Sequence, residues 1–177
     1  MTADKNFIDS NILLYLLSAD AKKADTAEAI LRVGGLISVQ VLNEINNVAR
    51  QKLGMSWTEI NQFLATVRAL CTIESLTVET HDRGREVAER YGLSVYDSMI
   101  VSAALLAGCT TLYSEDMKHE LLVDKQLRVV NPFKAPQTLN QLRKPRGMPI
   151  NQRGENCTSQ GASRLRCNST FRLARFA

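Results

Sequence analysis

The chain has 177 residues, an apolar fraction of 45% and a net charge of +4. A chain of this length usually folds as one domain with a sizeable core. It has no apolar run of about 18 residues and no basic segment followed by an apolar run near Met1, so we expect neither a membrane span nor a signal peptide. Its two histidines and four widely spaced cysteines argue against a zinc site and fit a reducing cytoplasm.

The positive charge is concentrated in the C-terminal part of the chain. Residues 138–177 hold eight Arg or Lys and a single acid, Glu155, whereas residues 1–137 hold 14 basic and 17 acidic side chains. The net charge is therefore no argument that the folded part binds nucleic acid. Apolar periodicity stops after Pro136, so we expect one folded domain over residues 1–136 and a basic, disordered tail over residues 137–177.

Short apolar strands alternate with amphipathic helices along the predicted domain. Strands are predicted at Lys5–Asp9, Leu36–Val39, Thr72–Leu76, Thr111–Ser114 and Leu127–Val130. Helices are predicted at Asn11–Ser18, Lys22–Val33 and Val41–Leu53, from a Ser56 cap to Leu70, and at Glu79–Tyr91 and Val95–Ala107. Strands joined by helical crossovers indicate a parallel sheet with helices on both faces, an α/β fold.

Two acids follow predicted strands directly. The segment Phe7-Ile8-Asp9 is an apolar strand that ends in a carboxylate, and Ser10 or Asn11 can cap the helix that follows. Asp116 comes just after the fourth predicted strand. Acids in these places lie at the carboxyl edge of the sheet, where open α/β sheets bind ligands. The structural alternatives are a helix N-cap for Asp9 and a turn for Asp116.

Two further acids lie on predicted helices. Glu44 shares a helix face with Val41, Ile45 and Val48, and a buried carboxylate needs a partner or a metal ion. The alternative is a Glu at the edge of the apolar stripe that reaches water or pairs with a base. Asp97 lies in the first turn of the most apolar helix, where the helix dipole alone favours an acid. Because that helix must be buried nearly all round, its first turn is expected to be packed as well.

Together, the four acids indicate a cation site. Converging carboxylates raise one another's pKa and stay ionised together only around a cation. Ligands that are all oxygen suit Mg²⁺ or Mn²⁺ rather than zinc. Such a cation, in a chain without a recognisable Ser, Cys or His catalytic group, suits hydrolysis of phosphodiester bonds. One ion or two would serve, and the sequence leaves the number open.

Four segments resemble, in order and spacing, the motifs of PIN-domain nucleases, and among these the VapC-type toxins of bacterial toxin–antitoxin pairs. The segments are Phe7–Leu13, Ser38–Glu44, Tyr96–Ile100 and Leu112–Asp116. The resemblance covers residues 5–134 and omits the tail. It implies a three-layer α/β/α fold with a central parallel sheet and endoribonuclease activity that depends on Mg²⁺ or Mn²⁺. It also implies an RNA substrate, a small antitoxin that inserts a segment into the acidic pocket, and a homodimer.

The resemblance also assigns roles to individual residues. Asp9, Glu44, Asp97 and Asp116 match the acids that bind metal and carry catalysis. Asn11 and Ser114 match residues that support these acids through hydrogen bonds to them or to water. Lys118 and Arg50 are candidates for binding RNA phosphates by charge, with solvated helix faces as the alternative.

Two other functions are compatible with this sequence. A PIN-like module that has kept the fold can bind RNA or a partner without cleaving it. A phosphoacceptor domain would use Asp9 as nucleophile, but it needs a second acid beside Asp9, where this chain has Ser10 and Asn11. The first alternative therefore competes more strongly with the nuclease.

Overall fold

A computed structural model describes residues 5–134, which form one six-stranded sheet with helices packed against it. The strands are β1 (Asn6–Ile8), β2 (Gly35–Ser38), β3 (Cys71–Glu74), β4 (Thr111–Tyr113), β5 (Leu122–Val123) and β6 (Leu127–Val130). The helices are α1 (Ser10–Leu14), the 3-10 helix η1 (Tyr15–Leu17), α2 (Ala21–Val33), α3 (Val39–Gln51), α4 (Trp57–Leu70), α5 (Val78–Tyr91) and α6 (Val95–Leu106). The tail predicted at 137–177 lies outside the described residues.

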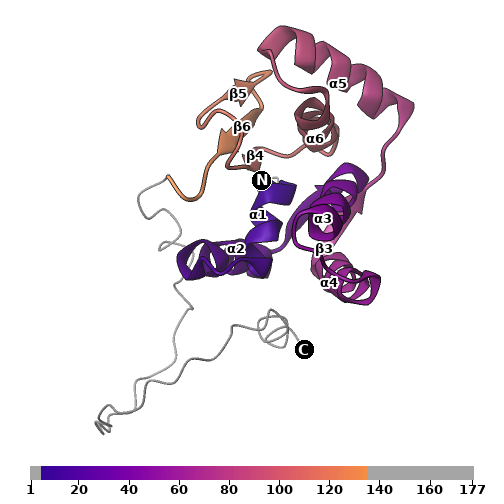
Figure 1. Cartoon of the computed structure of the whole chain (residues 1–177). Helices are drawn as coiled ribbons and strands as arrows, with labels where there is room; N and C mark the ends of the chain where they lie inside the picture. The colour runs from indigo at the N-terminus through magenta and orange to yellow at the C-terminus, as the bar shows by residue number, and fades with distance from the viewer. Residues whose placement is uncertain (1–4, 135–177) are drawn as a thin grey trace, which may run out of the picture.

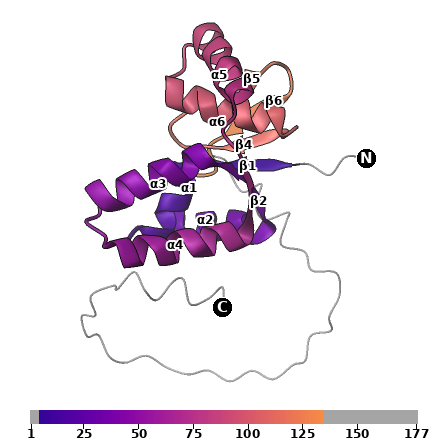
Figure 2. The same ribbon diagram turned by 90° about the vertical axis from the view of Figure 1, so that its right-hand side faces the viewer.

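The sheet has the strand order β3-β2-β1-β4-β6-β5, and only the β5–β6 pair is antiparallel. Helices α2 and α4 lie on one side of the sheet, and α5 and α6 lie on the other (Figures 1 and 2). The predicted α/β fold with a central parallel sheet between helical layers is confirmed. In residues 5–134, no helix is both long and apolar enough to span a bilayer.

The order of the strands determines where a ligand can bind. From β1 the chain builds the sheet outward through β2 and β3, and it then returns to add β4 on the other side of β1. Such a reversal leaves a crevice at the carboxyl ends of the two central strands, which is where open α/β sheets bind ligands. The residues that follow β1 and β4 are Asp9 and Ser114, and Asp9 N donates to Tyr113 O at 3.0 Å.

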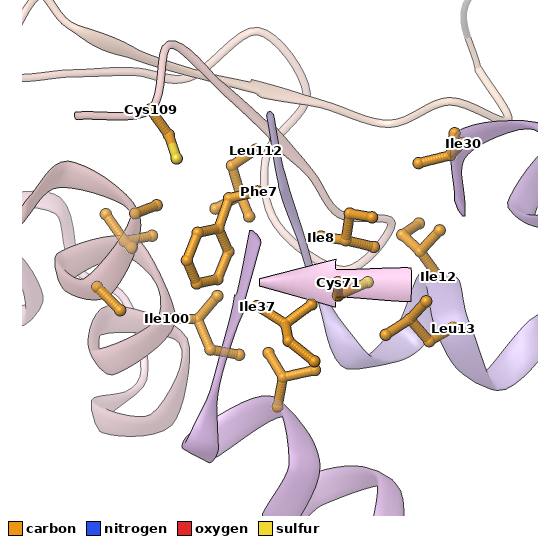
Figure 3. Close-up of a cluster of buried hydrophobic side chains, with 14 of the residues drawn as sticks. Phe7, Ile8, Ile12, Leu13, Ile30, Ile37, Cys71, Ile100, Cys109 and Leu112 are labelled. Atoms are coloured by element: carbon orange, nitrogen blue, oxygen red, sulfur yellow. The ribbon is translucent and has the colours of Figure 1, made fainter. Parts of the chain in front are cut away.

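The core around β1 holds this edge in place. Phe7 and Ile8 are fully buried, and their side chains point to opposite faces of the sheet as strand geometry requires. In Figure 3, Phe7 lies beside Leu112 and Ile100, whereas Ile8 lies toward Ile12 of α1. The apolar layers on both faces of the sheet therefore bury β1 completely at these two residues.

The sequence analysis did not predict β5. This strand has two residues, and the turn to β6 contains Asp124 and Lys125 with positive φ angles of 48° and 57°. Three residues, Asp124 to Gln126, join β5 to β6. Turn positions with positive φ are usually Gly or Asn, and neither residue is present here, so the usual sequence signal of a hairpin is absent.

Candidate active site

Asp9 lies at the carboxyl end of β1 and is almost completely buried, with 2% of its surface exposed. It is the N-cap of α1, because its Oδ1 accepts a hydrogen bond from the backbone N–H of Ser10 at 2.6 Å. The prediction that Ser10 or Asn11 caps this helix was therefore wrong. The side chains of those two residues donate hydrogen bonds to carboxylates instead.

Ser10 connects Asp9 to Glu44 on α3. The Ser10 hydroxyl lies 2.6 Å from Glu44 Oε2 and 3.2 Å from Asp9 Oδ1. A hydroxyl donates one proton, and the shorter distance favours Glu44 as the acceptor. The other oxygen of Glu44, Oε1, accepts a hydrogen bond from Gln40 Nε2 at 2.9 Å. The structure thus places the half-buried Glu44 beside Asp9.

Asn11 and Ser114 connect Asp9 to Asp116. Asn11 Nδ2 donates to Asp9 Oδ2 at 2.9 Å and to Asp116 Oδ2 at 3.1 Å. The buried Ser114 hydroxyl donates to Asp9 Oδ2 at 2.7 Å and lies 3.3 Å from Asn11 Nδ2. Asp116 itself is exposed. The acids that follow β1 and β4 therefore meet at one edge, with an amide and a hydroxyl between them.

Asp97 lies in the first turn of α6 and is half-buried. Its backbone N–H donates to Ser94 Oγ at 3.1 Å, and the Ser94 hydroxyl donates to Asp97 Oδ2 at 2.8 Å. One carboxylate oxygen of Asp97 therefore takes part in capping the helix. Its link to the site is electrostatic, because its negative charge contributes to raising the pKa of Asp9.

The surroundings of Asp9 raise its pKa from 3.8 to about 6. Burial is the largest cause, because it disfavours the charged carboxylate. Hydrogen bonds from Ser114 and from the backbone of Ser10 lower the pKa, while the charges of Glu44 and Asp97 raise it. None of these groups is a lysine or an arginine. Asp9 therefore lies in a negative field that no basic group among them balances.

The comparisons with known proteins identify the family of the chain. The family model of the PIN domain matches residues 7–123. The chain belongs to the PIN-domain family. No curated protein gives a significant sequence match.

Two solved structures resemble this PIN domain in fold. A chain of a toxin–antitoxin complex from Klebsiella pneumoniae is 20% identical with a TM-score of 0.56, and the match covers 72% of this chain and 98% of that one. VapC20 of Mycobacterium tuberculosis, described as a sarcin–ricin loop cleaving toxin, is 18% identical with a TM-score of 0.54, covering 63% of this chain and 90% of that one. At such identities the likeness shows the fold alone.

The acid cluster of this PIN domain fits a hard divalent cation by its chemistry. Carboxylate oxygens are the donors that Mg²⁺ and Mn²⁺ prefer. Among residues 5–134, however, no three Asp, Glu, His or Cys side chains are already arranged as ligands around one point. Ser10 and Asn11 connect the acids here, and a shared ion would take over part of that role. The uncompensated charge near Asp9 is what a cation would balance.

Three neighbours of the acids were missed by the sequence analysis. Ser10 was assigned to capping, yet its hydroxyl bonds Glu44. Gln40 precedes Glu44 by one helical turn, a spacing that could have indicated their hydrogen bond. Glu115 donates its backbone N–H to Asn11 Oδ1 at 3.2 Å. No local pattern in the sequence indicates this last contact, because the partners are far apart in the chain.

The two basic residues considered for RNA differ in their surroundings. Lys118 is exposed, two residues after Asp116. Arg50 lies at the other end of α3 from the helix start, where it donates to Met55 O at 3.0 Å and covers the Trp57 ring at 5.5 Å from the centroid. Through these contacts, the Arg50 side chain packs against the turn between α3 and α4. RNA binding by either residue stays a prediction.

Proposed function

We propose that this PIN-domain protein is an endoribonuclease that depends on Mg²⁺ or Mn²⁺ and is the toxin of a toxin–antitoxin pair. The observation that carries the proposal is the buried Asp9, which has carboxylates around it and a pKa raised to about 6. A buried acid whose charge is opposed by its surroundings is more common at functional sites than in structural positions.

Asp9, Glu44, Asp97 and Asp116 are the residues that would hold the cation. When bound, a divalent cation lowers the pKa of a water molecule and offsets charge on the leaving oxygen of a phosphodiester. The protein's contribution is to fix its ligands. Ser10, Asn11 and Ser114 restrict the carboxylate orientations through the hydrogen bonds described above.

The family and the similar structures support RNA as the substrate and an antitoxin as the partner. One similar structure is a toxin–antitoxin complex, and another is a toxin that cleaves the sarcin–ricin loop. Exposed Leu53 and Trp57, at the α3–α4 turn, offer apolar surface to a partner. A cytoplasmic location and a homodimer belong to the same proposal, and light scattering on the purified chain tests the dimer.

The experiment is cleavage of total cellular RNA by purified protein, with Mg²⁺ or Mn²⁺ and with a chelator. Asp9→Asn tests the site, and Asp82→Asn is the matched control because Asp82 is an exposed acid of α5. We expect discrete fragments that need metal, disappear with Asp9→Asn and remain with Asp82→Asn.

A different outcome would decide against the nuclease. If the folded wild-type protein, freed of any antitoxin, binds RNA but leaves it intact with both metals, the non-catalytic binding module is the better account. Fragments that are unchanged in Asp9→Asn would instead show that the assigned site is wrong.

A further inference from the structure

A compact group of side chains lies next to the acid cluster and belongs to none of the roles above. Lys23 of α2 donates to Glu115 Oε1 at 2.6 Å and to the Tyr15 hydroxyl at 2.7 Å, and Tyr15 donates to Glu115 Oε2 at 2.5 Å. The Lys23 ammonium also lies 4.4 Å from the centroid of the Tyr15 ring and 5.0 Å from that of Phe133. We call Lys23, Tyr15 and Glu115 the anchor cluster.

The anchor cluster fully engages the Glu115 side chain. Both carboxylate oxygens accept a hydrogen bond, and the ion pair is partly buried, with 29% of the Lys23 side chain and 26% of the Glu115 side chain exposed. Burial alone would raise the pKa of Glu115, but the hydrogen bonds from Lys23 and Tyr15 lower it. Glu115 is therefore a charged residue with its charge matched, directly beside the unmatched acids.

The backbone of Glu115 connects the anchor cluster to the site. Its N–H donates to Asn11 Oδ1 at 3.2 Å, and its carbonyl accepts from the buried Asn131 Nδ2 at 3.2 Å. With its oxygen held by Glu115, the Asn11 amide has its nitrogen directed to Asp9 and Asp116. Asn11 and Tyr15 are four residues apart, so they lie on the same side of the short helical segment. Asn11 contacts the backbone of Glu115, and Tyr15 contacts its side chain.

We propose that the anchor cluster is a positioning device for the acid cluster: it fixes Glu115, and through it the orientation of the Asn11 amide between Asp9 and Asp116. Glu115, Lys23 and Tyr15 are then positioning residues, because none of them needs to touch metal or RNA. The effect on catalysis rests on the proposed function. The anchoring of Asn11 can be measured whether or not the protein cleaves RNA.

The test uses two variants of the anchor cluster and one control. Lys23→Met removes the ammonium, and Tyr15→Phe removes only the hydroxyl and leaves all charges in place. Arg83→Met is the control, because Arg83 pairs with Glu86 and Asp124 in a partly buried ion pair of another region. Thermal unfolding is recorded for each variant, and Tyr15→Phe serves if Lys23→Met does not fold.

Three quantities separate positioning from plain stabilisation. They are the side-chain amide NMR signals of Asn11, the affinity for Mn²⁺ measured by calorimetry, and kcat and KM for RNA. We expect both cluster variants to shift the Asn11 signals, to weaken Mn²⁺ binding about 10–100-fold and to lower kcat more than KM, as loss of groups that orient ligands does. Arg83→Met should lower the unfolding temperature and leave all three quantities unchanged.

The proposal is overturned if the cluster variants lower only the unfolding temperature, as the control does. If Lys23→Met raises KM while Tyr15→Phe has no effect, Lys23 acts as a phosphate contact and the positioning account is wrong. If the wild-type protein neither binds Mn²⁺ nor cleaves RNA, the proposed function fails. The Asn11 signals then decide the anchoring alone, and unchanged signals in both variants overturn it.

Discussion

Two regions of this PIN domain gather charged side chains from several elements, and they differ in how charge is balanced. In the β5–β6 turn, Asp124 accepts hydrogen bonds from Arg83, from Arg90 at 3.0 Å and from the Tyr91 hydroxyl at 3.0 Å. At the carboxyl edge of the sheet, Asp9 is surrounded by acids and neutral donors, and its pKa is raised to about 6. Among residues 5–134, Asp124 has two basic partners, whereas no basic group contributes to the pKa of Asp9.

We infer a different role for each region from this difference. Two arginines and a tyrosine from α5 hold the turn that contains Asp124, in which Asp124 and Lys125 have positive φ. Around Asp9 the hydrogen-bond donors are neutral and the charged neighbours are acids, so negative charge is in excess, and this lowers the stability of the fold when no cation is bound. The balanced cluster stabilises structure, whereas the unbalanced cluster is where the proposed function requires a cation.

The largest expected effect comes from removing an acid of the unbalanced cluster. Asp97→Asn should reduce RNA cleavage by more than about 100-fold, because the proposed function makes Asp97 a metal ligand and losing a ligand costs more than losing a group that orients one. Its unfolding temperature should stay near that of the wild type, since an amide at the same place still accepts the Ser94 hydrogen bond. Metal-dependent cleavage retained in Asp97→Asn would remove Asp97 from the site.

A smaller loss is expected when the bridge between the acids is removed. Asn11→Ala deletes the amide that joins Asp9 to Asp116, so the affinity for Mn²⁺ should fall by roughly 10–100-fold. Calorimetric titration of the folded variant measures this directly. An affinity equal to the wild type's would show that the bridge does not organise the ligands.

The balanced cluster should respond in the opposite way. Asp124→Asn leaves two arginines without their carboxylate, so the free energy of unfolding should fall by roughly 1–3 kcal/mol. RNA cleavage by the folded variant should stay within about twofold of the wild type. Urea unfolding and a cleavage assay on the same preparation test both parts, and a loss of cleavage without loss of stability would contradict the contrast between the two regions.

The pH dependence of stability distinguishes the regions further. The pKa of Asp9 is about 6 in the folded chain against a usual 3.8, so the folded state holds a proton that the unfolded state has lost between these values. Stability is therefore highest below the lower pKa and falls as pH rises toward 6, by on the order of 3 kcal/mol in total and about 1 kcal/mol between pH 5 and pH 8. In urea titrations between pH 5 and pH 8, the free energy of unfolding of the metal-free wild type should fall by about 1 kcal/mol more than that of Asp9→Asn. Parallel pH profiles would show that Asp9 is not perturbed.

Local signals in the sequence were sufficient for most of the fold. The predicted cap at Ser56 is present, and strands β1 and β4 end one residue before the predicted ends at Asp9 and Ser114. Strand β5 was missed because two residues show no periodicity. The four acids could be predicted because each lies near a strand end or within an apolar helix. Both features can be recognised from residues that are close together in the sequence.

The connections between the acids could not be predicted in the same way. Whether Ser10 caps its helix or bonds Glu44 depends on how α3 lies against α1, which no local pattern contains. Glu115 was not singled out because its partners, Tyr15 and Lys23, lie about a hundred residues away in the chain. Tertiary packing decides such contacts, so the sequence indicates the ligands of a site better than it indicates what orients them.

The most direct test of the account is the stabilisation of the metal-free protein by Mn²⁺ at pH 8, measured as the shift in unfolding temperature. We predict a rise that saturates with Mn²⁺, persists in Asp124→Asn and is absent in Asp9→Asn, because a ligand that binds only the folded state stabilises it. An equal rise in Asp9→Asn, or none in the wild type, would show that the acid cluster is not a cation site.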